Sequence, residues 1–490
     1  YREIGGDTQQ AFGLRETDPL FKMPFLFTKA GFDNAEYGPN SEMMTRIAED
    51  RWIYGDSVNG EDFTEADLKK LSKDVEKLYL NEYAKRWQAF YQRFTLAPIK
   101  NGTQAVTMLR QLSDPISSPL IQVSELVAKN TELTPQIAID PKTGTAAGLA
   151  QKALGAIYEP TSVDQRFQDI QRLVKSENGM PSKLQTYLEG IQQLSEYFGQ
   201  INGAPDSNAA AFEVAKAKFT TNSADAIQQL KNMAATAPDQ AKGWLNHLAS
   251  STWSIIGGKA KTHVDTVWRY QVYDNYRDNL YGRYPMSVDS RSEATIVGFD
   301  EFFKPGGIQQ SFVDEFIAPF VDVRRWKAKG YDGVSLGLSS NSLAQFRRAD
   351  NIRKAFYASG ESAGAEFRVE PQKLDSSIRL FVLEVGEARI SYSHGPRIPK
   401  DIVWSGAENN RSRIVFEDLN ERVSSKQYDG DWSFMRMLDD ANPVQAGSAR
   451  EYTATFTEKG HKAVYRLTAQ GSINMFDRGL LRNFSCSQSL

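Results

Sequence analysis

The chain has 490 residues, of which 40% are hydrophobic and 24% are charged, a composition typical of globular proteins rather than of disordered or collagenous chains. It carries 58 basic and 61 acidic residues, and the formal net charge of −3 predicts no overall basic field that would attract nucleic acid. The mean hydropathy is −0.49 and the sequence contains no apolar run of membrane-spanning length, so we expect no transmembrane helix within it.

Charge is balanced on a coarse scale. Residues 366–490 hold 17 basic and 17 acidic side chains, so the small negative excess belongs to the preceding part of the chain. From this balance we expect no surface asymmetry that would point to a membrane or a polyanion.

The chain starts at Tyr1 without the apolar stretch of a signal peptide, and we expect it to be a piece of a longer protein whose targeting or membrane segments lie upstream. Its single cysteine, Cys486, excludes intrachain disulfides and cysteine-rich zinc sites. The four histidines form no HExxH motif and no pair three or four positions apart. We expect His247 to lie in a helix core and His394 in a turn, and the sequence predicts neither a metal site nor a cofactor.

The first part of the chain is predicted to be helical. Residues 1–60 are rich in Gly, Asp and Asn and predict a loop-rich leading segment with a short helix near 42–50. The clearest helix follows over about 30 residues, and Thr64 and Asp67 form its capping signal. Its apolar side chains recur at steps of three, four and five along one stripe: Leu68, Leu71, Val75, Leu78, Tyr83, Trp87, Phe90 and Phe94.

Further helices are predicted downstream, where apolar side chains recur at helical spacing. They cover 103–112, 120–130, a segment through Phe167, Ile170 and Val174, 184–198, 207–218, 223–235, 239–256 and 260–281. Residues 131–160 are rich in Thr, Gly, Ala and Pro and predict a linker with a short Ala-rich helix.

The period of the apolar residues changes from helical to alternating near Phe367. Strands are predicted at 367–370, 377–385, 388–392, 413–416, 452–456 and 463–468. Short strands separated by turn signals indicate an antiparallel sandwich. The predicted fold class is therefore α+β, with a long N-terminal all-helical region followed by a C-terminal antiparallel β-sandwich domain, and not an alternating βαβ fold.

This pattern predicts four parts along the chain. Residues 1–60 form the leading segment, which packs on the helical region, and 61–280 form a helical domain. Residues 281–365 form a helical subdomain that leads to the β-domain, and 366–490 form the β-sandwich domain.

Two short motifs resemble enzyme signatures but lack the required context. Residues 333–337 (GVSLG) fit the G-x-S-x-G pattern of serine esterases, but no buried strand precedes them as a nucleophile elbow requires. We therefore place Ser335 in a loop that leads into a helix. Residues 257–259 (GGK) are not a phosphate-binding loop, because Trp253 and Ala260 replace its first glycine and its hydroxyl.

Carboxylates and tryptophans in the β-region leave a glycan site open. Asp431, Asp439 and Asp440 lie near Trp432, and glycoside hydrolysis needs two carboxyl groups that flank the scissile bond. The simpler interpretation is a short helix over 432–438 with Asp439 and Asp440 at its exposed end. An exposed, coplanar Trp404 and Trp432 would form a glycan platform, whereas we expect both in the core of the sandwich.

Three consecutive stretches form a more specific pattern: 281–286 (YGRYPM), 298–307 (GFDEFFKPGG) and 312–322 (FVDEFIAPFVD). They resemble the motifs grYPf, DF-x-x-FF-x-P-G-G and F-x-x-x-f-l-x-P-f-v-d of the IcmF-like family of type VI secretion proteins, also called TssM, in its portion beyond the membrane anchors. Within them, we expect Phe302 and Phe303 to fill a local core and the prolines and glycines to set turns.

Segments on both sides resemble the same family in the same order. They are 27–32 (FTKAGF), 52–55 (WIYG), 78–87 (LYLNEYAKRW), 117–120 (SSPL), 394–396 (HGP), Trp404, 430–433 (GDWS), 436–439 (RMLD), 474–476 (NMF) and 484–486 (FSC). Glu82 stands where the family has Asp. Met475 and Ser487 stand where it has prolines, so we expect a different turn geometry there.

The resemblance implies a non-enzymatic structural scaffold. Family members are anchored in the inner membrane of Gram-negative bacteria by upstream helices, so this chain would be a periplasmic portion that meets the membrane only through segments outside it. With TssL, the outer-membrane lipoprotein TssJ and further copies of themselves, they build the envelope-spanning membrane complex. Contacts with TssJ lie toward the C-terminal region, and no nucleic acid is implied as a partner.

Two other functions stay open from the residues alone. A cell-wall hydrolase would need clustered carboxylates in a cleft, and a module that binds peptidoglycan or another glycan would need the exposed tryptophan platform. The sequence assigns no residue to catalysis, to a metal, to a cofactor or to a partner.

Overall fold

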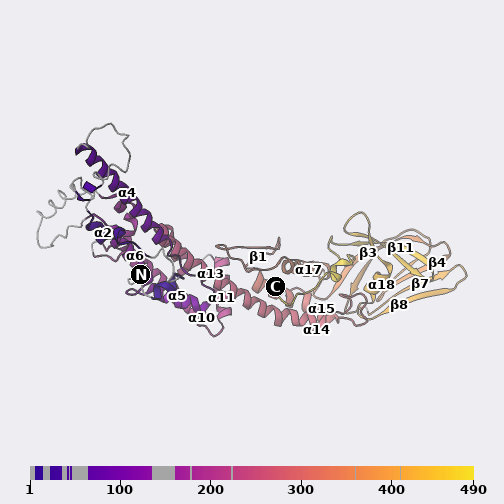
Figure 1. Cartoon of the computed structure of the whole chain (residues 1–490). Coiled ribbons are helices and arrows are strands. Elements are labelled where there is room, and N and C mark those ends of the chain that lie inside the picture. The colour runs from indigo at the N-terminus through magenta and orange to yellow at the C-terminus, as the bar shows by residue number, and fades with distance from the viewer. Residues whose placement is uncertain are drawn as a thin grey trace. The chain divides into compact units, whose positions relative to one another are not determined.

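The structure is a computed structural model with two compact units, shown in Figure 1. Unit 1 comprises residues 1–210 and 223–256, and unit 2 comprises residues 211–222 and 257–490. The structure describes residues 6–14, 22–35, 41–42, 45–46, 65–134, 160–176, 179–221, 224–358, 360–408 and 410–490. No helix in these ranges combines the length and the apolar character that a membrane crossing requires.

Unit 1 is helical, as predicted. Its elements are α1 (Gly6–Ala11), η2 (Phe25–Phe27), α2 (Lys29–Asp33), α4 (Glu65–Gln92), α5 (Gly102–Ser113), α6 (Pro119–Thr131), α8 (Ser162–Arg166), α9 (Gln168–Val174), α10 (Lys183–Asn202), α12 (Ala226–Ala235) and the first parts of α11 (Ser207–Thr221) and α13 (Asp239–Val267). The single helix expected through Phe167 is two helices, because the backbone at Phe167 leaves the helical conformation (φ −104°, ψ 9°). The expected cap at Thr64, the 52–55 motif and most of the 131–160 linker lie outside the described residues.

The long helix α4 is fixed by aromatic side chains on one face. The Trp87 indole donates to the carbonyl of Phe27 (2.7 Å), and the Tyr83 hydroxyl donates to the carbonyl of Asn130 (2.5 Å). The predicted stripe is wrong at Leu78, which is 70% exposed. The buried stripe instead starts at Leu80, since five residues turn a helix by about 140° and carry Leu78 away from the face of Tyr83.

Asp164 joins two stretches of unit 1 that are distant along the chain. Its buried carboxylate accepts bonds from the Leu133 amide (2.8 Å), the Thr134 hydroxyl (2.7 Å), and the amide (3.0 Å) and hydroxyl (2.7 Å) of Thr161. Burial alone would raise the pKa of Asp164, but these hydrogen bonds outweigh that effect and lower it. The carboxylate therefore links residues 133–134 to Thr161.

We predict that Asp164→Asn lowers the free energy of unfolding by about 2 kcal/mol at neutral pH, because an amide cannot accept all of these bonds. The folded-state pKa lies below the ordinary value of 3.8, so this stability is complete above that value and is lost as the pH falls through the folded-state pKa. The gap between wild type and variant should therefore shrink in acid. Urea unfolding followed by circular dichroism measures it. Asp169→Asn, an exposed site on α9, is the control and should cost almost nothing.

Unit 2 begins with helices and ends with strands. Its helical elements are the later parts of α11 and α13, the π-helices η4 (Trp268–Tyr273) and η5 (Val313–Ile317), and α14 (Asp274–Asn279), α15 (Ile296–Phe303), α16 (Ile308–Phe312), α17 (Ser340–Phe356), α18 (Ser433–Ala441) and α19 (Gly479–Arg482). Two helices were expected at 239–256 and 260–281, but α13 continues through Gly257 and Gly258 without a break. Gly257 serves packing, because a Cβ there would lie 2.7 Å from Cγ1 of Val334.

The glycine pair offers a matched test of this packing. Gly258→Ala should stabilise the protein by about 0.5–1 kcal/mol, because no atom lies within 4 Å of the added Cβ and alanine favours a helix. Gly257→Ala should instead destabilise it by about 1 kcal/mol or more, because the stiff Val334 side chain must move. Thermal unfolding of the two variants measures the difference. Equal stabilisation by both would show that this contact does not limit packing.

A short hairpin interrupts the helices of unit 2. Strands β1 (Val321–Asp322) and β2 (Lys327–Ala328) pair antiparallel. Trp326, in the turn, has φ 50° in the left-handed region, which costs a residue with a side chain about 1–2 kcal/mol. Its ring stacks on Phe346 of α17 with a centroid distance of 6.0 Å, and this contact anchors the strained turn.

The strands of unit 2 form the predicted antiparallel sandwich. One sheet has the order β6-β3-β11-β10-β9 and the other β5-β4-β7-β8. Their bounds are β3 Gly364–Leu374, β4 Ile378–Val385, β5 Ala388–Tyr392, β6 Lys400–Ser405, β7 Arg411–Asp418, β8 Val423–Asp429, β9 Val444–Gln445, β10 Glu451–Glu458 and β11 His461–Ala469. Phe381 of one sheet meets Phe456 and Tyr465 of the other at 5.8 and 5.4 Å between ring centroids, so the core lies between the sheets.

The last residues of the chain pack on the helices of unit 2. The Trp268 indole donates to the carbonyl of Ser487 (2.9 Å), and the amide of Leu490 donates to Asp265 (3.2 Å). Residues 484–490 therefore complete a core that begins more than 200 positions earlier.

Candidate functional site

In the described part of unit 2, several polar contacts between distant segments meet at α18 (Ser433–Ala441). Helix α18 packs against β7, β8 and β10. The Trp432 indole, just before α18, donates to the carbonyl of Ala294 (2.7 Å). This bond ties the sandwich to the segment that follows Tyr284, so we treat the junction as the candidate site.

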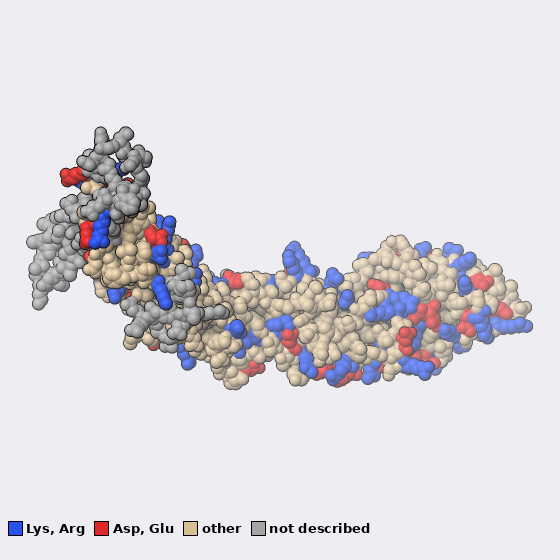
Figure 2. All heavy atoms as spheres, viewed as in Figure 1, with Lys and Arg blue, Asp and Glu red and all other residues tan. Residues whose placement is uncertain are grey.

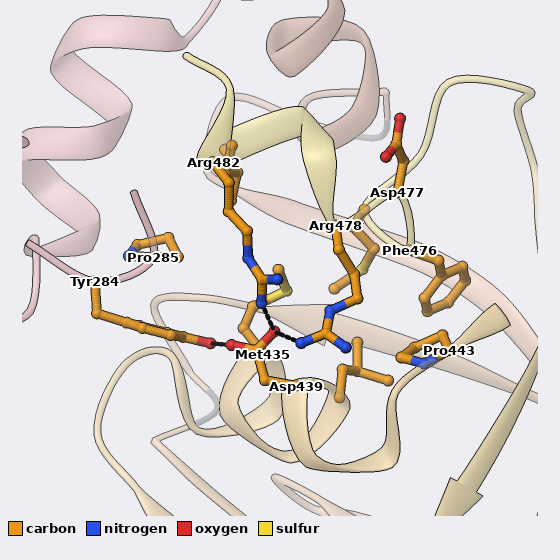
Figure 3. Close-up of a pocket in the computed structure, with 12 residues that line it drawn as sticks. Tyr284, Pro285, Met435, Asp439, Pro443, Phe476, Asp477, Arg478 and Arg482 are labelled. Carbon is orange, nitrogen blue, oxygen red and sulfur yellow. Dashed lines mark hydrogen bonds and ion pairs between the residues drawn. The ribbon is translucent and has the colours of Figure 1, made fainter. Parts of the chain in front are cut away.

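Asp439 is the centre of this junction (Figure 3). Its carboxylate accepts bonds from the Tyr284 hydroxyl (2.8 Å), Nη2 of Arg478 (3.2 Å) and Nη2 of Arg482 (2.6 Å). Burial and the nearby Asp439 carboxylate raise the pKa of Tyr284 far above its usual range, so the tyrosine stays a neutral donor.

A second pair of charges locks the same segments together. The Arg436 guanidinium lies 3.9 Å from the centre of the Tyr284 ring, and its Nε donates to Glu293 (2.7 Å). Gly430 faces this pair with φ 101°, and a Cβ there would lie 2.7 Å from the Glu293 carboxylate. Only glycine therefore fits between α18 and the Glu293 segment without a rearrangement.

A third carboxylate holds the start of β3. Asp300 of α15 accepts bonds from the Tyr357 hydroxyl (2.8 Å), the Ser362 hydroxyl (2.7 Å) and the Ala363 amide (2.8 Å). The pKa of Tyr357 is raised by burial and by this carboxylate. The helical part of unit 2 and its sandwich are therefore joined by directed, charge-assisted bonds as well as by apolar packing.

The cavity at the junction is small. It measures about 20 Å³ and is lined by residues that include Tyr284, Asp439, Arg478 and Arg482. This volume suffices for about one water molecule and is far below that of a typical ligand pocket. The junction is built to hold segments together rather than to admit a substrate.

Asp439 and Asp440 were expected at the exposed end of a short helix, and this prediction is correct for Asp440 but wrong for Asp439. Helix α18 extends to Ala441, and Asp440 is exposed, but the Asp439 side chain keeps only 20% of its surface exposed. Asp440 forms an ion pair with Lys426 and accepts a bond from Tyr428 (2.6 Å). Both carboxylates are thus engaged in structural contacts, which disfavours the hydrolase interpretation.

The burial of Trp404 and Trp432 contradicts the hypothesis of an exposed tryptophan platform for glycans. Trp404 and Trp432 both have 0% exposure, and their rings are 5.9 Å apart and tilted by 40°. Both lie in the core as predicted, so the glycan-binding hypothesis loses the surface on which it depended. Phe302 and Phe303 are also buried, as predicted.

The remaining sequence candidates occupy structural positions. Ser335 is exposed in a loop that leads to α17, and its hydroxyl accepts from the Gly337 amide (3.3 Å). His394 lies in a bend with Nε2 2.7 Å from the carbonyl of Ile378, and His247 lies in α13, 3.2 Å from the carbonyl of Ala97. Within the described residues, no group of three or more His, Cys, Asp or Glu could hold a metal ion.

Two edge strands of the sandwich carry exposed apolar side chains. Edge strands β6 and β8 expose Val403 (63%) and Val423 (61%), and the adjoining loops expose Ile398 and Leu419. Edge strands offer backbone groups for pairing, and exposed apolar residues on them mark candidate contact surfaces.

Two family models match the chain, one at each end. The family model described as "IcmF-related: Intracellular multiplication and human macrophage-killing" matches residues 1–132, and "Type VI secretion protein IcmF C2-like domain" matches 367–471. The "Type VI secretion system component TssM1" of Pseudomonas aeruginosa (strain PAO1) is 28% identical over 515 residues, which cover 99% of this chain and 46% of that protein. The chain is therefore similar to TssM/IcmF-like proteins along its whole length. It spans about half the length of this curated relative.

Two solved structures share the fold of this chain. A "Type VI secretion system membrane core complex" chain matches with a TM-score of 0.71 at 16% identity, covering 98% of this chain and 94% of that one. A "Type VI membrane complex" chain matches with a TM-score of 0.68 at 14% identity, covering 98% and 87%.

The motifs that carried the family resemblance meet one another at the junction. Tyr284, from the YGRYPM stretch, binds Asp439 from RMLD, and Trp432 from GDWS binds the backbone ahead of the GFDEFF stretch. Sequence reasoning did not find Arg478 and Arg482, because lone arginines near the chain end carry no spacing signal. Their partner Asp439 stood inside a motif and was the only clue.

We predict that Asp439→Ala lowers the free energy of unfolding by about 2 kcal/mol, because two half-buried guanidiniums and the Tyr284 hydroxyl lose their acceptor. Tyr284→Phe should cost about 1 kcal/mol, and the double variant should cost less than the sum of the two. Denaturant unfolding measures all three.

The matched control is Asp431→Ala. The Asp431 side chain forms no hydrogen bond or ion pair within the described part of the chain, so its loss should be nearly neutral. Strict additivity of the Asp439 and Tyr284 changes would contradict the shared bond.

Proposed function

We propose that this chain is a non-enzymatic structural scaffold of the type VI secretion membrane complex. The observation that carries the proposal is the match along 99% of the chain to a protein named as a type VI secretion component. The family models at both ends, 1–132 and 367–471, support the same assignment. The junction around Asp439 fits this role, since its polar groups bind one another across different segments. Its cavity has room for about one water molecule.

The proposed location is the bacterial envelope, with this chain as a periplasmic portion of an inner-membrane-anchored protein. The relative is about twice as long as this chain, which leaves room for anchors in the rest of such a protein. In this proposal the four parts 1–60, 61–280, 281–365 and 366–490 serve as structural segments of the scaffold.

The proposed partners are the outer-membrane lipoprotein TssJ, the inner-membrane protein TssL and further copies of the chain. We assign the TssJ contact to the sandwich, because its edge strands expose Val403 and Val423 together with unpaired strand edges. A partner strand or loop can bind such an edge through backbone bonds and bury the apolar side chains.

We predict saturable binding of the full chain to the folded domain of a cognate TssJ lipoprotein, measured by calorimetry. Val403→Lys and Val423→Lys each place a charge on one edge. The variant on the edge that TssJ uses should bind about tenfold more weakly, since a buried apolar contact is replaced by a charge.

The control is Val297→Lys on α15, which is equally exposed and lies outside the sandwich edges. It should bind TssJ as the wild type does. No heat of binding with a correctly folded TssJ domain would refute the assignment of this partner. If Val403→Lys and Val423→Lys both bind TssJ as tightly as the wild type does, the contact lies away from β6 and β8.

A further inference from the structure

A local concentration of positive charge lies on unit 2. Residues 321–356 hold eight basic and three acidic side chains, a net charge of +5 within a chain of net charge −3. In Figure 2, basic side chains project from the surface at the place where Figure 1 labels β1. We define the basic patch as the exposed cations of the β1–β2 hairpin and of α17: Arg324, Arg325, Lys327, Arg347 and Arg348.

The fold holds these cations outward. Arg325 and Lys327 are exposed, while Trp326 between them is half-buried and stacks on Phe346. The two arginines that directly follow Phe346 on α17 are also exposed. One aromatic contact therefore anchors the hairpin to the helix and brings the cations of both elements to the same region of the surface.

The basic patch is not neutralised by the rest of the described chain. Arg325 is 82% exposed and reaches Asp322 only at 4.0 Å, whereas the other four members form no ion pair within the described residues. Clustered like charges repel one another, so the arrangement opposes the stability of the free chain. The left-handed backbone at Trp326 adds strain at the same turn, and such strain gathers where structure serves binding.

The chemistry of the basic patch favours an extended polymer that carries carboxylates. Guanidinium groups match planar oxyanions with paired hydrogen bonds. Arg324 and Arg325 lie in the turn of the hairpin and Lys327 begins β2, so three exposed cations within four positions can meet several carboxylates of one polymer. A lipid surface is less suited, because membrane docking needs an apolar anchor, yet the Trp326 ring is packed on Phe346 and Val323 is only 39% exposed.

We propose that the basic patch binds the free carboxylates of peptidoglycan peptide stems. The identity of the polymer rests on the proposed function, because a periplasmic scaffold would pass the cell wall. The interaction is electrostatic and lies on the surface of unit 2, separate from the sandwich edges assigned to TssJ. It would hold the scaffold laterally to the wall without a pocket.

The first test is co-sedimentation of the full chain with purified peptidoglycan sacculi. Combined Arg324→Ala, Arg325→Ala and Lys327→Ala should weaken binding about tenfold or more, as expected for three surface cations that face a polyanion. The control combines Lys373→Ala, Arg450→Ala and Lys462→Ala, which removes the same charge from exposed sites in the sandwich domain away from β6 and β8 and should leave binding unchanged. Equal binding by wild type and hairpin variant overturns the proposal.

The second test changes the polymer. Sacculi whose carboxylates have been converted to neutral amides should lose binding to the wild type, and undiminished binding would overturn the carboxylate assignment. Tighter binding to vesicles that contain phosphatidylglycerol than to sacculi would assign the basic patch to lipid phosphates instead. Salt should weaken binding to native sacculi, because exposed charges are screened beyond about 10 Å at 0.1 M.

Two measurements keep the outcome interpretable. The single charge reversal Lys327→Glu changes an exposed side chain and should weaken sacculus binding even if the triple variant folds poorly. TssJ binding by each variant reports the proposed function separately. A hairpin variant that keeps TssJ and loses sacculi supports the basic patch. If the wild type does not bind TssJ, but its binding to sacculi is lost in the hairpin variant, only the assignment of TssJ as a partner is refuted.

Discussion

The carboxylate of Asp439 is a single acceptor that joins three elements far apart along the chain. It comes from helix α18, which packs on strands of both sheets, and its donors come from the segment around Tyr284 and from the late arginines Arg478 and Arg482. One negative charge lies between two positive ones, and the tyrosine remains protonated because burial and Asp439 raise its pKa. Apolar packing alone would let these elements slide, whereas bonds to one small group fix their position.

The same device recurs in both units. Asp164 gathers donors from both sides of residues 135–159 in unit 1, and Asp300 gathers donors at the start of β3 in unit 2. Asp164 and Asp300 are buried or half-buried and face neutral donors, so their charge is stabilised by hydrogen bonds, whereas two of the donors to Asp439 are charged guanidiniums. A few acceptors can thus fix the relative positions of segments within each unit, while the surrounding core excludes water. This also explains why the acidic residues Asp439 and Asp300, inside the motifs, are engaged in contacts between segments.

The sequence predicts the order of helices and strands well, because apolar spacing directly reflects which face is buried. It fails where one residue decides the outcome. Two helices were predicted with a gap at 257–259, yet α13 is continuous there, and Gly257 is required by the approach of Val334. Strand β8 was missed because an edge strand with one inward side chain, Tyr428, shows no alternation. The junction could not be predicted, since Arg478 and Arg482 become meaningful only once the fold brings them to Asp439. Charge averaged over a whole domain likewise conceals a cluster of a few side chains.

The packing of residues 484–490 on early helices has a consequence for synthesis. Phe484 lies against Tyr276 and Phe303, and Leu490 reaches Asp265, 225 positions earlier. Unit 2 also takes residues 211–222 from the middle of unit 1's sequence. Because the ribosome releases the chain from its N-terminus onward, the aromatic side chains of these helices wait for partners that are made about 200 residues later. During that interval they are natural targets for holding chaperones, and a chain cut short before Phe484 would keep this binding surface permanently exposed.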